Sequence, residues 1–181
     1  MQDRQTAAVA VNGRDRSLDI LRDAGYLTFE DYWNSPREFV DDVNYRRNGW
    51  SAVSLIELEL GDGSKRRYYL KRQENQIRYS LRHPLGALTY QFEVEAVAQM
   101  ARQLISCVSV LDYGFRRNDG KRQGYVVTEA IDGECLKDFA NSDPDWSSVS
   151  EQISSLSKQL FRMHANGWQH GALYPVHIFM N

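Results

Sequence analysis

The 181-residue chain has almost no net charge, no long apolar run and only two cysteines. Its 24 acidic and 22 basic residues leave a net charge of −2, which excludes a polyanion binder that depends on bulk charge alone. No run approaches the ~18 apolar residues of a membrane-spanning helix. Cys107 and Cys135 lack the spacing of a metal or redox motif, so we expect two reduced structural thiols.

The first residues also lack a recognisable targeting signal. Residues 1–10 include Asp3 and Arg4 and no long apolar stretch, so they do not read as a secretory signal, and we expect a cytoplasmic protein. A chain of 181 residues with 42% hydrophobic positions can bury one core of ordinary size but is too short for two full domains.

Charge is distributed unevenly along the chain. Residues 15–42 carry eight acidic and three basic side chains, whereas residues 65–82 carry seven basic side chains and one acid. The second segment predicts a basic face that meets an anionic ligand. A strand edge that Lys and Arg keep solvated is an equal alternative.

The N-terminal region is predicted to decorate the main body. The first dozen residues show no periodicity and are expected to form a disordered tail. Two short helices follow, one from Ser17 to a break at Gly25 and one over residues 29–33 that ends before Pro36.

The middle of the chain has mostly strand patterns. Strands are expected at residues 43–47, 51–60, 67–72, 108–113 and 125–130, with turns at Asn48-Gly49, 61–64 and 116–120. A helix with one apolar face is expected at residues 92–104, before the last two strands. This order predicts an α+β fold with a five-stranded antiparallel sheet and one long helix.

After Gly133 the pattern becomes helical. Ser148 and Glu151 have the spacing of a capping box, and an apolar stripe follows until Asn166-Gly167. We therefore expect a tail with short helices at residues 1–42, a sheet-containing lobe at 43–133 and the start of an incomplete helical lobe at 134–181.

The last segment is similar to the catalytic loop of protein kinases. Residues 170–179, His-Gly-Ala-Leu-Tyr-Pro-Val-His-Ile-Phe, keep the His, Leu, Pro, Ile and apolar last position of His-Arg-Asp-Leu-Lys-Pro-x-Asn-Ile-Leu. Ala172 replaces the aspartate and cannot accept a hydroxyl proton, and His177 replaces the metal-binding Asn although Mg²⁺ prefers oxygen donors. His170 is expected to bond the loop backbone, with a packed core histidine as the alternative.

A strand lysine and a helix acid extend the kinase pattern. Lys71 lies on the third expected strand, where a kinase has the lysine that contacts the α- and β-phosphates of the nucleotide. Glu93 and Glu95 on the following helix are both candidates for its ion-pair partner. We expect Glu95, because it precedes the apolar step of Ala96 and Val97.

Two further segments have expected nucleotide contacts. The turn that contains Gly49 and Ser51 would cover the phosphates with backbone N–H groups. Residues 128–131, with Glu129, Ala130 and Ile131, would form a hinge whose backbone groups hold the adenine edge. A core strand that simply leaves the sheet explains the hinge sequence equally well.

Residues 45–181 together resemble the bacterial lipopolysaccharide kinase (Kdo/WaaP) family, and most of all its acid-inducible InaA subgroup. The resemblance is carried by residues 46–53, 69–75, 82–86, 92–95 and 167–179. Its most specific parts are Leu-Lys-Arg-Gln at 70–73 and Leu-Tyr-Pro-x-His-Ile-Phe at 173–179. It implies a protein-kinase-like fold, ATP with Mg²⁺, and phosphoryl transfer to a heptose or Kdo sugar of the lipopolysaccharide inner core.

The basic segment would then bind the anionic core glycan through Arg72, Arg78 and Arg82. Because Ala172 replaces the aspartate and no Asp-Phe-Gly-type segment precedes Asn181, we expect the chain to be inactive as it stands. The alternative is a pseudokinase that binds a nucleotide or an anionic partner without chemistry. A nucleic-acid partner is not expected at a pI near 6.1. Peripheral contact of the protein with the inner face of the inner membrane is expected.

Overall fold

The structure, a computed structural model, describes residues 13–36, 38–171 and 173–180. The expected disordered tail and Ala172 lie outside these residues. The chain divides into two units. The first comprises the described residues up to Gln99 together with Val108–Ala130, and the second comprises Met100–Cys107 and the residues from Ile131 onwards.

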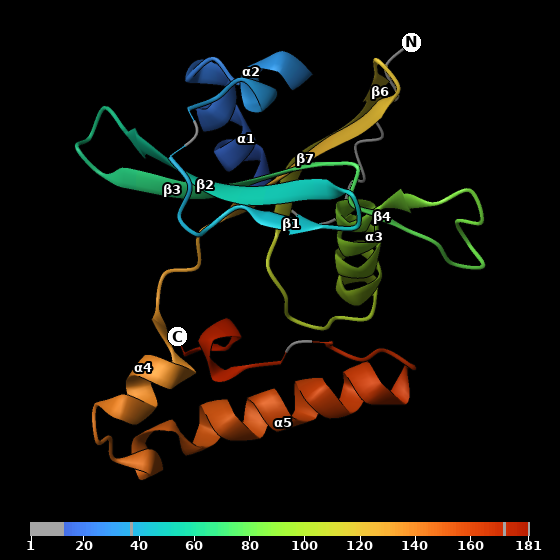
Figure 1. The fold of residues 1–181 in the computed structure, drawn as a ribbon. Coiled ribbons are helices and arrows are strands. Elements are labelled where there is room, and N and C mark those ends of the chain that lie inside the picture. Colours follow the sequence, from blue (N-terminus) through green and yellow to red (C-terminus); the bar gives the residue numbers. More distant parts are fainter. Residues whose placement is uncertain (1–12, 37, 172, 181) are drawn as a thin grey trace. The chain divides into compact units, whose positions relative to one another are not determined.

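The first unit is built on a five-stranded antiparallel sheet with the strand order β1-β2-β3-β7-β6 (Figure 1). The strands are β1 (Asn44–Arg46), β2 (Gly49–Glu59), β3 (Lys65–Glu74), β6 (Val110–Asn118) and β7 (Lys121–Glu129). With the long helix α3 (Thr89–Arg102), this confirms the predicted sheet and helix. The sequence did not predict the small ladder of β4 (Ile77–Arg78) and β5 (Ala87–Leu88) between β3 and α3.

The sheet is covered on both faces, as the side chains of β3 show. Tyr68 and Leu70 point into the cluster that includes α1 (Gly13–Asp23) and α2 (Phe29–Trp33), whereas Lys71 lies on the opposite face, where α3 packs. Successive strand residues alternate between faces, so one strand serves both layers. Figure 1 shows α1 and α2 on one side of the sheet and α3 on the other.

The two N-terminal helices are part of the main core, so their prediction as decoration is wrong. Leu21 of α1 and Tyr32 of α2 are almost fully buried against Tyr125 and other residues of the sheet. The rings of Tyr32 and Tyr125 stack with centroids 4.4 Å apart. The sheet has an apolar face on this side, and without α1 and α2 that face would be exposed to water.

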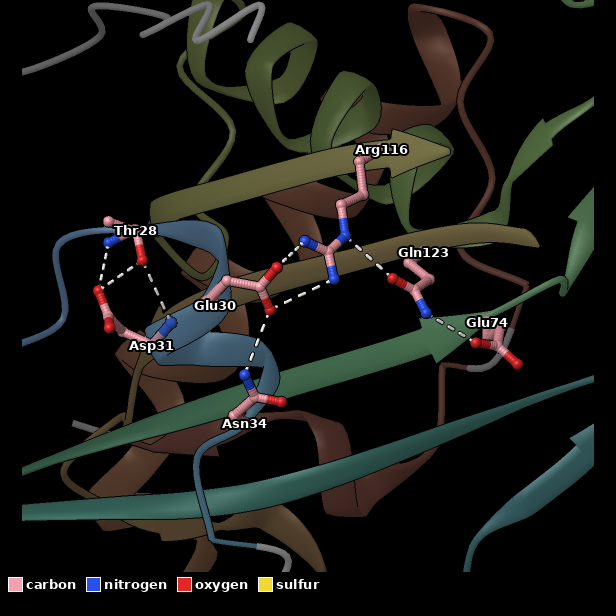
Figure 2. A network of polar contacts seen from close by, with 7 residues as sticks. All are labelled: Thr28, Glu30, Asp31, Asn34, Glu74, Arg116 and Gln123. Carbon is pink, nitrogen blue, oxygen red and sulfur yellow. Dashed lines mark hydrogen bonds and ion pairs between the residues drawn. The ribbon is translucent and has the colours of Figure 1, made fainter. Parts of the chain in front are cut away.

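A polar network on the surface fastens α2 to the sheet (Figure 2). Arg116 of β6 binds the carboxylate of Glu30, donates to Gln123 Oε1 at 2.9 Å, and lies 4.0 Å from the ring centroid of Phe29. Gln123 Nε2 in turn donates to Glu74 Oε2 at 2.8 Å. The network therefore joins α2, β6, β7 and β3.

The second unit contains α4 (Leu136–Asn141), the 3₁₀ turn η1 (Trp146–Val149), α5 (Ser150–Ala165) and η2 (Pro175–His177). Its short strands β8 (Glu134–Cys135) and β9 (Phe179–Met180) pair with each other. The predicted capping box is wrong, because Ser148 lies inside η1 and its hydroxyl donates to Asp145 O at 2.7 Å. Among the described residues, no helix combines the length and apolar character needed to cross a bilayer.

Candidate functional site

Lys71 lies in the middle of β3, directly between Val53 of β2 and Val126 of β7 in the ladder. Two residues further, the buried side chain of Gln73 donates to Thr89 Oγ1 at 2.9 Å and accepts from the backbone N–H of Tyr90 at 3.3 Å. Because Thr89 and Tyr90 begin α3, Gln73 fixes the start of this helix against the strand that carries the lysine.

Lys71 Nζ forms an ion pair with Glu93 Oε1, and each side chain remains about a quarter exposed, at 24% and 28%. The expected partner, Glu95, is therefore wrong. Glu95 Oε1 instead lies 2.8 Å from His83 Nε2. Two residues rotate a helix by about 200°, so Glu93 and Glu95 point to nearly opposite sides and only one of them can face β3.

The side of α3 that faces the sheet could have been read from its apolar stripe. Tyr90, Val94 and Val97 pack on Val126 and its neighbours in the sheet. Glu93 follows Tyr90 by three residues and so lies on the same face of the helix. Glu95 does not share this spacing, and its position next to Ala96 and Val97 was a misleading signal.

Tyr90 lies near the ion pair, at the start of α3. Burial, and next the nearby carboxylate of Glu93, raise the pKa of the Tyr90 hydroxyl to about 12. A side-chain hydrogen bond with Ser51 acts in the opposite direction. Ser51 is itself buried, so its hydroxyl serves this contact with Tyr90 inside the unit.

The turn before Ser51 is a tight hairpin that packs onto the end of β3. Arg47 and Asn48 have φ angles of 54° and 59°, as a two-residue type I′ turn requires. A Cβ at Gly49 would overlap the backbone of residues 74–76. This close approach explains the glycine by packing alone, so the role of Gly49 and Ser51 above nucleotide phosphates stays a prediction.

The expected hinge follows β7. The backbone N–H of Ala130 donates to Arg67 O at 2.9 Å, so this N–H is already used within the sheet. The carboxylate of Glu129 accepts from Ser17 Oγ at 3.2 Å. Adenine contacts by the remaining backbone groups of Glu129, Ala130 and Ile131 stay predictions.

Arg72 is not available to a substrate, and its prediction as a glycan-binding residue is wrong. The residue is only 1% exposed and points to the side of α2. Its guanidinium donates to the backbone oxygens of Trp33 (3.1 Å), Ser35 (2.7 Å) and Pro36 (3.1 Å) and to Ser54 Oγ (2.7 Å). Arg72 therefore fastens the segment after α2 to the sheet.

Arg78 and Arg82 lie on the β4–β5 hairpin and are both exposed. The guanidinium of Arg78 lies 5.2 Å from the ring centroid of Phe92 on α3. Beside the hairpin is a pocket of about 420 Å³ lined by Arg47, Asn48, Asn75, Ile77 and Tyr79. Glycan binding by Arg78 and Arg82 stays a prediction.

In the second unit, the kinase-like loop brings two histidines together. The ring centroids of His170 and His177 are 6.3 Å apart, and the ring centroids of Tyr174 and His177 are 5.9 Å apart. The backbone N–H of Leu136 donates to Ile178 O at 2.7 Å, which holds the loop against the start of α4. Within the described part of the chain, no three His, Cys, Asp or Glu side chains gather as a metal site, so metal binding by His177 stays a prediction.

A comparison of sequences identifies the family. The profile of the lipopolysaccharide kinase (Kdo/WaaP) family matches residues 30–181, which is most of the chain. The chain belongs to this family. Membership confirms the resemblance carried by the Leu-Lys-Arg-Gln and Leu-Tyr-Pro-x-His-Ile-Phe segments.

Two individual proteins show the distance of the relationship. Protein InaA of Escherichia coli (strain K12) is 27% identical over 168 residues, which cover 87% of this chain and 73% of that protein. The solved structure described as WaaP in complex with acyl carrier protein has a TM-score of 0.44 and 19% identity, over 75% of this chain. This chain spans about half, 54%, of the length of that WaaP chain.

Sequence reasoning missed the residues that position the lysine. Gln73 belongs to the family-like segment at 70–73, but its contact with Thr89 and Tyr90 depends on where α3 starts. Tyr90 lies just outside the helix range expected from the sequence, which began at Phe92. An earlier start of the helix by one turn would have placed Tyr90 and Glu93 on one face.

Proposed function

We propose that this chain is a kinase-like nucleotide-binding protein in which Lys71, held by Glu93, contacts the phosphates of ATP. The Lys71–Glu93 ion pair between β3 and α3 is the observation that carries the proposal. A kinase uses this pair to present the ammonium group to the α- and β-phosphates. Both side chains are partly exposed, so the ammonium retains access to a ligand.

The residues around Lys71 are better suited to bind the phosphates of a nucleotide than to bind a metal ion without a nucleotide. Lys71 supplies a positive charge, and Glu93 orients it rather than adding a second ligand. Mg²⁺ arriving with the nucleotide would neutralise phosphate charge, since it is usually bound through substrate phosphates and few protein carboxylates. The protein's own contribution in this proposal is to hold one ammonium group in a fixed position.

We further propose that binding is not followed by phosphoryl transfer. The reaction requires a group that orients the attacking hydroxyl and accepts its proton, and the methyl group of Ala172 can do neither. Ala172 lies outside the described residues, so this step of the argument rests on sequence. The function would then be that of a pseudokinase, which regulates or recruits through its nucleotide-bound state.

Family membership favours a second candidate, an active kinase for a sugar of the lipopolysaccharide inner core. In that case the acceptor hydroxyl would be activated by a group other than residue 172. The two candidates share nucleotide binding and differ only in turnover.

The binding step is tested by titrating the protein with Mg-ATP in a calorimeter. Loss of one charge-assisted contact costs about 1.5–3 kcal/mol, so Lys71→Met should weaken ATP binding by roughly ten- to a hundredfold. Glu93→Gln should weaken it as well, because the lysine loses its orientation. Glu95→Gln is the matched control and should bind as the wild type does; equal affinities for the Glu93 and Glu95 variants would disprove the role of the pair.

The turnover step is tested with ATP, Mg²⁺ and purified inner-core glycan. We expect no phosphate transfer above a control without protein. Transfer that disappears in Lys71→Ala would reject the pseudokinase in favour of the sugar kinase. Ala172→Asp is informative in the same assay, since gain of transfer would show that residue 172 is the missing element.

A further inference from the structure

The β4–β5 hairpin has an unusual composition for this chain. Residues 75–92 contain no Asp or Glu, although the chain has 24 acidic residues in all and Glu74 and Glu93 flank the segment. The hairpin carries Arg78 and Arg82. It therefore presents positive charge with no carboxylate of its own to neutralise it.

The same hairpin exposes three large apolar side chains. Tyr79 is 68% exposed, Leu85 82% and Leu81 essentially completely, at 104%. Isolated exposed leucines are common on protein surfaces. Three apolar side chains within seven residues, together with the neighbouring Arg78 and Arg82, form a local amphipathic surface instead.

The base of the hairpin is held by specific contacts. Arg122 donates to the backbone oxygens of Gly86 and Leu85, the latter at 3.0 Å. His83 lies 2.8 Å from the Glu95 carboxylate, and its ring is 5.0 Å from that of Phe92. These contacts fix both strands on α3 and β7 and leave the tip to project from the unit, as the green hairpin in Figure 1 shows.

We propose that the β4–β5 hairpin docks the protein on an anionic lipid bilayer. Leu81 and Leu85 would enter the boundary between headgroups and acyl chains, and Tyr79 would lie at the interface, where aromatic residues are favoured. Arg78 and Arg82 would pair with lipid phosphates. The charge favours this occupant, because an apolar tip between two arginines complements a surface that is anionic outside and apolar beneath.

This inference goes beyond nucleotide binding and does not depend on it. Lys71 and Glu93 are not among the docking residues, and the docking surface needs no ligand at Lys71. The contact between Glu95 and His83 has a role in this proposal, because it holds the hairpin against α3. Glu95 thus positions the hairpin, whereas Glu93 positions Lys71.

Docking is tested by co-sedimentation of the full chain with vesicles at ~0.15 M salt. Vesicles of phosphatidylcholine mixed with phosphatidylglycerol should bind the protein, and phosphatidylcholine alone should not. At ~1 kcal/mol per arginine, the double variant Arg78→Gln/Arg82→Gln should lower the partition coefficient roughly thirtyfold. Arg67→Gln/Arg117→Gln removes the same charge from exposed positions outside the hairpin and should leave binding nearly unchanged.

The apolar contribution has its own matched pair. Leu81→Ser should reduce binding on the order of tenfold or more, because a leucine side chain no longer leaves water. Leu27→Ser, at a leucine 54% exposed in the α1–α2 connection, should not reduce it. Leu81 has no buried contacts to lose, and equal melting temperatures of the two variants would confirm that both are folded.

The depth of the tip is measured with Leu81→Trp. Its emission should shift to the blue on anionic vesicles and be quenched by lipids brominated on their acyl chains. Two results would overturn the proposal. One is no binding to anionic vesicles, including the case in which the hairpin variants lose an acidic protein partner instead. The other is an equal loss of vesicle binding in both arginine double variants.

Discussion

Arg72 should be a stability residue, and replacing it tests the structure where sequence reasoning was wrong. Arg72→Met keeps most of the apolar stem of the side chain and removes all donors of the guanidinium. Three backbone oxygens, those of Trp33, Ser35 and Pro36, and Ser54 Oγ then lose a donor in a site where Arg72 itself is only 1% exposed.

The expected cost follows from these partners. A buried acceptor left without a donor costs about 1–3 kcal/mol of folding free energy, so three such carbonyl groups together cost several kcal/mol. The variant also avoids burying a charged guanidinium, which offsets part of that loss. We expect a net loss of about 2–4 kcal/mol, a large fraction of the ~5–15 kcal/mol that stabilises a typical domain.

Urea unfolding measures the loss, with the shift in midpoint converted through the m-value. Hydrogen exchange should locate the loss of stability, because the amides of α2 and of Asn34 and Ser35 lose protection before those of α5 in the second unit. Arg78→Met is the matched control: it removes an exposed arginine that contacts the ring of Phe92, and should cost less than about 1 kcal/mol. If Arg72→Met and Arg78→Met cost the same, the buried role of Arg72 is refuted.

Three further predictions concern the hairpin turn, the α2 network and Tyr90. Gly49→Ala should lower stability by about 1–3 kcal/mol, measured by urea unfolding, because the added methyl group meets backbone atoms of residues 74–76 that cannot rotate away. The hydrogen bond from Arg116 lowers the pKa of Glu30, so the ionised carboxylate stabilises the folded state and Glu30→Gln should reduce the melting temperature near neutral pH. The difference in melting temperature between the variant and the wild type should vanish as Glu30 is protonated at a pH below its ordinary pKa of 4.5. Burial raises the pKa of the Tyr90 hydroxyl to about 12, above its ordinary value of 10.0, so the folded state favours the neutral form. The stability that this neutral form contributes is lost as the pH rises from 10.0 towards 12. Tyr90→Phe should therefore show a smaller fall in melting temperature over this pH range.

The strands and the long helix followed directly from local pattern. Alternation of apolar residues over two strands around Asn48-Gly49 specifies a hairpin, and the structure has one there. Its two turn residues with positive φ are Arg47 and Asn48, one position earlier than expected. The apolar spacing of the segment after Phe92 specifies a helix. These signals are local because backbone hydrogen bonds and side-chain direction repeat within a few residues.

The roles of charged residues did not follow from pattern. Arg72 shares a strand face with Tyr68 and Leu70, which pack in the core, and the alternation alone would have placed it there. Its positive charge was instead read as a sign of exposure. A buried arginine is stable only because the segment around the end of α2 brings three backbone carbonyl groups to it. Each of these hydrogen bonds joins two residues that are separated by 36 to 39 positions in the sequence.

By itself, the sequence determined the family, the order of strands and helices, and the presence of a lysine on the third strand of the sheet. Tertiary structure decided which acid faces that lysine, since the rotation of α3 about its axis depends on its packing and on the contact with Gln73. It also decided that α1 and α2 belong to the core, because the apolar face they cover exists only once distant strands have paired.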